Sequence, residues 1–199
     1  MTLTPIPFTH LTFKDDFWTH RIQVNRESTL PTIYKQLRQT GRLKAWDGTW
    51  KKGDPQPPHV FWDSDTAKWM EGAAYSLATH PDKKLERTLD KMIDQIGKLQ
   101  RRDGYFNSHY IQVEMHNRWS NLRDKHELYG AGHLIEAAVA YLEVTGKRKF
   151  LDIMCRFADH IDATFGSEPG KQRGYCGHQE IELALVRLYR VTGEPRYLK

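Results

Sequence analysis

The sequence has few cysteines, no long apolar run and no dense block of one charge. Its two cysteines, Cys155 and Cys176, match neither a CxxC metal motif nor a disulfide framework. We therefore expect free thiols in a reducing compartment. The N-terminus lacks the basic and apolar regions of a secretory signal, and no apolar stretch approaches the ~20 residues of a membrane span. These features predict a soluble, cytoplasmic protein.

The charge pattern gives no indication of a nucleic-acid or membrane partner. Lys and Arg number 30 against 25 Asp and Glu, for a formal net charge of +5. The basic residues are spread along the chain, and the one tight group, Lys147–Lys149, follows a predicted helix, where it complements the helix dipole. With 199 residues and 39% hydrophobic content, the chain can bury one sizeable core.

Helical periodicity extends through most of the sequence. Residues 1–15 are expected to be extended, because Pro5 and Pro7 disfavour helix. Helices are predicted over 16–40 (divided at Pro31), 63–79, 81–100, 124–146, 147–165 and 179–192, with another starting at Glu194. A short strand or extended loop is predicted over 105–113. Long loops at 41–59 and 166–177 complete this assignment.

An internal repeat indicates how these helices are arranged. The stretch AAVAYLEVTGKRKFL (137–151) aligns with ALVRLYRVTGEPRYL (184–198), and YSLATHPDKKL (75–85) is a fainter copy. Each copy is a helix, a tight turn and the start of a returning helix. Such hairpins bury their apolar faces by stacking into a solenoid or a closed toroid. The sequence therefore predicts an all-α fold, and the helix that opens at Glu194 predicts a chain truncated at its C-terminus.

The predicted helix over 124–146 has an unusual interior. Asp124 is placed as its N-cap, and Glu127 completes a pair similar to a capping box. Gly130 and Gly132 each cost roughly 1 kcal/mol relative to Ala inside a helix. Close packing or function is expected to offset that cost.

Three helix starts combine polar and aromatic residues: FWDSD (61–65), DKHE (124–127) and GHQE (177–180). In a ring of hairpins, equivalent helix ends face one opening, where such side chains would suit the hydroxyls and apolar faces of a sugar. His126 and His178 are the main candidates for sugar contacts, with Asp65 and Glu180 beside them. Ordinary structural roles compete with this interpretation at several positions: N-caps at Asp63 and Asp124, core packing at Trp62 and Trp69, and a core histidine at His133.

Four stretches resemble glycoside hydrolase family 127, the β-L-arabinofuranosidases: FWDSDTAKWMEGAAY (61–75), RRDGYFNSHY (101–110), NLRDKHELYGAGHLIEAAVAYLEVTGKRKFLDI (121–153) and GHQEIELALVRLYRVTGEPRYL (177–198). The resemblance extends from about residue 11 to the end. It implies an (α/α)6 barrel followed by β-sandwich domains, and retaining removal of non-reducing-end β-L-arabinofuranosyl residues. Residues 16–199 would form the N-terminal half of that barrel.

The resemblance also implies the chemistry of the site. In this family a zinc-bound cysteine thiolate is the nucleophile and a glutamate is the acid/base, while two histidines that match His126 and His178 contact the sugar. Cys155 and Cys176 do not match the zinc ligands or the nucleophile. We therefore expect this chain to contact an L-arabinofuranose-containing oligosaccharide, to bind no zinc and to contain no catalytic residue. An exposed barrel edge would favour self-association.

Two other functions are compatible with the residues. One is an inverting (α/α)6 hydrolase or lyase that uses Asp63, Asp65, Glu127 or Glu180 directly, with carboxylates ~6.5–9.5 Å apart. The other is a non-catalytic helical-repeat interaction module.

Overall fold

The computed structural model describes residues 6–198, and within them the regular structure is helical, with no strand. The α-helices are α1 (Asp16–Val24), α2 (Leu30–Gln39), α3 (Trp62–Thr79), α4 (Lys83–Leu99), α5 (Glu127–Thr145), α6 (Lys149–Thr164) and α7 (Glu180–Thr192). The predicted all-α class is confirmed. None of these helices has the length and apolar content needed to cross a membrane.

One part of the predicted assignment is wrong and another is confirmed. Residues 105–113 form no strand; the chain turns through a π-helical segment at Tyr110–Glu114. Tyr105, Phe106 and Tyr110 are all buried, so the aromatic pattern reflects burial on several sides and not the two faces of a strand. The first helical region does fall into two α-helices, with Pro31 in the first turn of the second, α2.

The N-terminal region contains less regular structure. Residues 1–5 of the predicted extended segment lie outside the described residues. Beyond them, Phe8–His10 forms a short 3-10 helix before α1 begins. Helical backbone continues from α1 through a π-helical segment at Asn25–Thr29 into α2.

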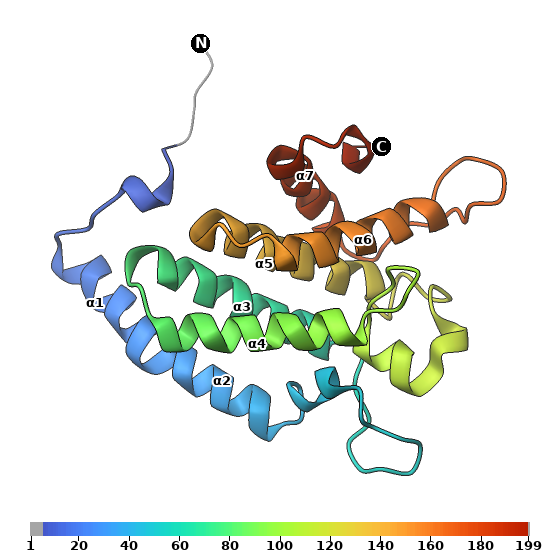
Figure 1. Cartoon of the computed structure of the whole chain (residues 1–199), viewed down its shortest axis with the longest axis horizontal. Helices are drawn as coiled ribbons and strands as arrows, with labels where there is room; N and C mark the ends of the chain where they lie inside the picture. The colour runs from blue at the N-terminus through green and yellow to red at the C-terminus, as the bar shows by residue number, and fades with distance from the viewer. Residues whose placement is uncertain (1–5, 199) are drawn as a thin grey trace.

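The helices are arranged in two layers (Figure 1). Helix α4 lies in front of α3, and α6 lies in front of α5, so each pair is a hairpin. Helix α5 packs against α3 on one side and against α7 on the other. Helices α3, α5 and α7 therefore form one layer, and their N-terminal ends carry the three polar motifs of the sequence.

Small side chains allow the inner helices to pack closely. Ala67, Ala73 and Ala74 of α3 and Ala131 and Ala138 of α5 are all essentially inaccessible to solvent. The outer helices α4 and α6 instead bury one stripe of large apolar residues, as expected for amphipathic helices with one face exposed. This packing makes α5 the central element of the fold.

A partly buried ion network joins the three inner helices at a distance from their N-terminal ends. Arg187 of α7 binds Glu136 of α5 and donates a 2.8 Å hydrogen bond to Tyr75 Oη of α3. Burial raises the pKa of Glu136, and Arg187 opposes that shift. Since removing one partner of a buried pair leaves an uncompensated charge, Arg187 fixes how α7 sits against α3 and α5.

Candidate functional site

The imidazole rings of His126 and His178 stack on each other. Their centroids lie 4.8 Å apart, and the ring planes differ by 24°. Phe61 packs on His126 at 4.9 Å, and Tyr129 lies 5.0 Å from His178. The two histidines, which precede different inner helices, therefore belong to a single aromatic wall.

This wall, formed by Phe61, His126, Tyr129 and His178, lines an open cavity of about 560 Å³. Asp65, predicted as a sugar contact together with the two histidines, also lines the cavity. Glu180, the fourth predicted contact, does not. The volume lies within the range of small-molecule pockets.

Gly177 brings His178 beside His126. A Cβ atom at this position would lie 2.2 Å from the backbone oxygen of Arg123, too close for any side chain. The Gly177 N–H donates a 3.3 Å hydrogen bond to Leu122 O. The loop before α7 can therefore approach the turn before α5 only with glycine here, and this approach places the next residue, His178, on the wall.

His126 occupies the N-cap position of α5 with a left-handed backbone, at φ 57°. This conformation is uncommon for a residue with a side chain, although His adopts it more often than most, and such residues cluster at functional sites. The next residue, Glu127, anchors it: its carboxyl accepts hydrogen bonds from Tyr105 Oη at 2.5 Å and from Trp119 N at 2.6 Å. The predicted capping by Asp124 is wrong, because α5 begins at Glu127 and has no side-chain cap.

Two of the predicted carboxylates serve the fold and do not reach the cavity. Glu127 is buried, and burial raises its pKa to about 7. Asp63 is also buried, and it accepts 2.7 Å hydrogen bonds from Trp46 Nε1 and Ser108 N, so it is not an N-cap. Burial raises the pKa of Asp63 as well. In contrast, Asp65 is partly exposed and pairs with Arg42 Nε at 2.8 Å.

Glu180 supports the wall from behind. Its Oε1 lies 3.0 Å from His133 Nδ1, and the His133 ring packs edge-on against Tyr129 with centroids 4.5 Å apart. Tyr129 Oη accepts a 2.6 Å hydrogen bond from Lys68 Nζ. Burial, aided by Lys68, lowers the pKa of His133 to about 4, so the imidazole beside Glu180 is neutral at neutral pH. Glu180, His133 and Lys68 together hold the Tyr129 ring.

The cavity offers neutral imidazole and charged groups of both signs. Burial and the neighbouring His178 lower the pKa of His126, which keeps its ring neutral at neutral pH. Its Nδ1 is buried and has no hydrogen-bond partner among residues 6–198. A neutral imidazole has one donor and one acceptor, and Asp65 and Lys68 add an acceptor and a donor. Hydroxyl groups on an apolar ring match this arrangement.

Sequence reasoning missed four residues of the cavity: Arg42, His59, Lys68 and Tyr129. Tyr129 follows His126 by one helical turn, and Lys68 follows Asp65 by the same step, so helical spacing could have indicated both. Arg42 lies in the turn after α2, and no sequence pattern connects it to Asp65.

The described residues do not fit a zinc-thiolate site. No group of three or more His, Cys, Asp or Glu side chains among them is arranged to hold a metal ion. Burial raises the thiol pKa of Cys155 and of Cys176, whose Sγ contacts the carbonyl oxygen of His178.

Comparison with known proteins identifies the family. The profile of the GH127 catalytic domain of β-L-arabinofuranosidases matches residues 10–199. The chain belongs to glycoside hydrolase family 127. Its helical hairpins are part of the (α/α)6 barrel of that family, as the resemblance predicted.

Individual family-127 relatives agree with this assignment. The non-reducing end β-L-arabinofuranosidase of Bifidobacterium longum subsp. longum is 49% identical over 144 residues, 70% of this chain and 22% of the relative. A GH127 β-L-arabinofuranosidase from Geobacillus stearothermophilus T6 superposes with a TM-score of 0.89 at 46% identity, covering 94% of this chain and 31% of that structure. A second GH127 β-arabinofuranosidase superposes with a TM-score of 0.90 at 36% identity, covering 97% of this chain and 32% of that structure. The chain thus spans between about a fifth and a third of these relatives.

Proposed function

We propose that this chain forms the sugar-binding wall of a glycosidase that removes non-reducing-end β-L-arabinofuranosyl residues from oligosaccharides. The observation that carries the proposal is the stacking of His126 on His178 in one cavity together with Asp65. In this proposal the three side chains hydrogen-bond the sugar hydroxyls, and Tyr129 and Phe61 contact its apolar face. Glu180 acts as a positioning residue through His133.

The proposal places the catalytic groups outside the described residues. Retaining hydrolysis needs a nucleophile and an acid/base close to the anomeric carbon. Asp63 and Glu127 are buried against structural donors, and neither Cys155 nor Cys176 lines the cavity. The contribution of this chain is therefore to bind and orient the terminal sugar. The two free thiols also support the predicted cytoplasmic location.

The inverting alternative has less support from the geometry. It requires two free carboxyl groups on opposite sides of a sugar. Asp65 is paired with Arg42, and Glu180 lies against His133 outside the cavity. Hydrolysis by this chain alone, abolished by Glu180→Gln, would favour that alternative.

An interaction role is supported at one edge of the fold. Leu183 and Val186 of α7 are 56% and 39% exposed, and exposed apolar faces of this kind promote association. We propose that this edge mediates self-association of the isolated chain.

Binding of methyl β-L-arabinofuranoside tests the proposed function. We expect saturable binding in isothermal titration calorimetry, weakened about tenfold or more by His126→Ala or His178→Ala, because each removes a hydrogen-bonding and stacking partner. His116→Ala is the matched control, since His116 is exposed and does not line the cavity. Unchanged affinity in both test variants, with unchanged melting temperature, would refute the proposal.

A further inference from the structure

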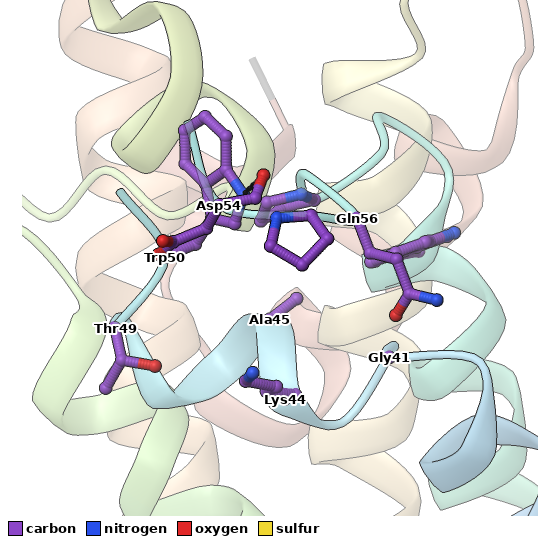
Figure 2. A pocket seen from close by; sticks show the side chains of 10 residues that line it. Gly41, Lys44, Ala45, Thr49, Trp50, Asp54 and Gln56 are labelled. Carbon is purple, nitrogen blue, oxygen red and sulfur yellow. Dashed lines mark hydrogen bonds between the residues drawn. The ribbon is translucent and has the colours of Figure 1, made fainter. Parts of the chain in front are cut away.

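We propose that a second cavity, beside the candidate site, binds the sugar unit that follows the terminal one. This inference rests on the proposed function and extends it to a second subsite. The cavity has a volume of about 270 Å³ and lies between the 3-10 helix Lys44–Asp47 and the loop 49–58 (Figure 2). Trp62 lines both this cavity and the candidate site. The two cavities therefore meet at the Trp62 indole, which is where a two-ring ligand would pass from one to the other.

The second cavity combines an aromatic surface with unused hydrogen-bonding groups. Trp50 lies in its wall, with its orientation fixed by a 3.2 Å hydrogen bond from Nε1 to Asp54 O. Lys44, Thr49 and Gln56 surround the opening (Figure 2). The side chains of these three residues have no hydrogen-bond partner within residues 6–198. Donors and acceptors around an indole suit a hydroxylated ring.

The backbone of Gln56 is held in a conformation that directs its amide towards Trp62. Its φ is 54°, in the left-handed region that favours glycine. A Cβ atom added at Gly41 would lie 3.4 Å from Gln56 Oε1 and 3.5 Å from the Trp62 ring, so both side chains converge on Gly41. Strained residues of this kind concentrate at functional sites.

The same backbone feature occurs at the candidate site. Within the described residues, the non-glycine positions with positive φ are Gln56, Trp119 and His126. Trp119 is buried, whereas Gln56 and His126 each line one of the two adjoining cavities. The structure thus places one such residue at each proposed subsite.

Size and charge limit what the second cavity can take. Its volume is below the usual range for drug-sized ligands, which suits one sugar ring and not a chain of them. The carboxylate of Asp54 accepts a 2.9 Å hydrogen bond from Lys51 N, and Asp54 and Lys44 give the lining one charge of each sign. The remaining groups suit a neutral, hydroxylated ligand.

The indole N–H signals of Trp50 and Trp62 in two-dimensional NMR test this subsite. Each signal is assigned from a Trp→Phe variant, and two ligands are titrated into the 199-residue chain. Methyl β-L-arabinofuranoside is expected to shift Trp62 and to leave Trp50 unchanged. A disaccharide with a β-L-arabinofuranosyl unit linked to L-arabinose is expected to shift both.

Gln56→Gly provides the matching affinity test, because glycine keeps the left-handed backbone without strain and removes the amide. We expect disaccharide binding to weaken about three- to tenfold, the effect of one hydrogen bond, with monosaccharide binding unchanged. Lys51→Ala is the control, because it lies in the same loop but does not line the cavity.

The outcomes separate this inference from the proposed function. If the monosaccharide binds but the disaccharide binds no more tightly, the second subsite is refuted and the proposed function stands. An equal loss for both ligands in Gln56→Gly, or a Trp50 signal that no ligand shifts, also refutes the subsite. If neither ligand binds, the proposed function fails and the subsite fails with it.

Discussion

Gly132 of α5 lies directly against Glu180 at the start of α7. A Cβ atom at Gly132 would be 2.7 Å from Glu180 Cγ and 3.0 Å from Ile181 N. The first turn of α7 therefore packs on the α5 backbone, and close packing offsets the cost of this glycine as predicted. Gly130 differs, because a Cβ atom there would meet nothing within 4 Å.

We predict that replacing Gly132 or Gly130 with Ala changes the stability of the protein in opposite directions. Gly132→Ala forces α7 away from α5 and should lower the free energy of unfolding by about 1–3 kcal/mol. The Cβ atom of Gly130→Ala would lie in open space, and the higher helix propensity of Ala should raise the free energy of unfolding by up to about 1 kcal/mol. Urea denaturation of both variants measures the difference. Equal effects would show that the α5–α7 contact is looser than described.

Gly177→Ala should disrupt the aromatic wall. Its Cβ would overlap the backbone of Arg123, so the loop must move and carry His178 away from His126. We expect binding of methyl β-L-arabinofuranoside to weaken by about tenfold, as for loss of a stacking and hydrogen-bonding group. Gly174→Ala is the control, because its nearest contact is the flexible end of the Leu122 side chain. Similar losses in both variants would point to a general loop effect.

Lys68 and Tyr129 should be energetically coupled. Lys68 Nζ donates to Tyr129 Oη and also lies 4.7 Å from the Tyr129 ring centroid. A double-mutant cycle with Lys68→Met and Tyr129→Phe should give a coupling energy of about 0.5–1 kcal/mol in unfolding experiments, the value for an exposed contact. A coupling near zero would mean that Lys68 does not hold the ring.

The stability of the protein should depend on pH through His133. Its folded pKa of about 4 lies below the ordinary value of 6.5, and Lys68 and Glu180 are the charged groups that face it. Burial and Lys68 favour the neutral ring in the folded state and outweigh the opposing effect of the Glu180 carboxylate, so this contribution is complete above pH 6.5 and is lost as pH falls towards 4. Phe does not titrate, so the His133→Phe variant lacks this pH dependence. As pH falls from 6.5 to 4, its free energy of unfolding should rise by up to about 3 kcal/mol relative to that of the wild type. Parallel pH profiles for the two proteins would contradict the assignment.

Self-association should depend on the exposed face of α7. Leu183→Glu should shift the sedimentation profile of the chain towards monomer, because it places a charge on an apolar surface. Val113→Glu is a suitable control, because Val113 is an exposed apolar residue on a different element, at 37%. A wild-type chain that is already monomeric at high concentration would refute the proposed edge contact.

The helix limits could be predicted from the sequence because they depend on local periodicity. Side-chain roles that depend on partners distant in sequence could not. Helices α3 to α7 begin and end within a few residues of their predicted limits, because their apolar spacing and turn residues are local signals. The predicted caps at Asp63 and Asp124 failed for a different reason. Asp63 binds donors from two segments distant in sequence, and Asp124 lies before the true start of α5.

The candidate site shows the same division. The proximity of His126 and His178 could be predicted, because equivalent helix starts meet in stacked hairpins. The displacement of Glu180 from the cavity could not, since it depends on the approach of α7 to Gly132. Arg42 was missed because its ion pair with Asp65 joins a turn to a helix.

The anchoring of Glu127 has a consequence for how a ligand is received. Tyr105 and Trp119 immobilise the residue next to His126, so the imidazole is already in place before any ligand arrives. In the proposed function, a sugar binds to a segment that is already ordered. Binding then costs little conformational entropy of the protein. We therefore expect analogues with a misplaced hydroxyl to bind more weakly, because moving His126 would disturb the hydrogen bonds that hold Glu127.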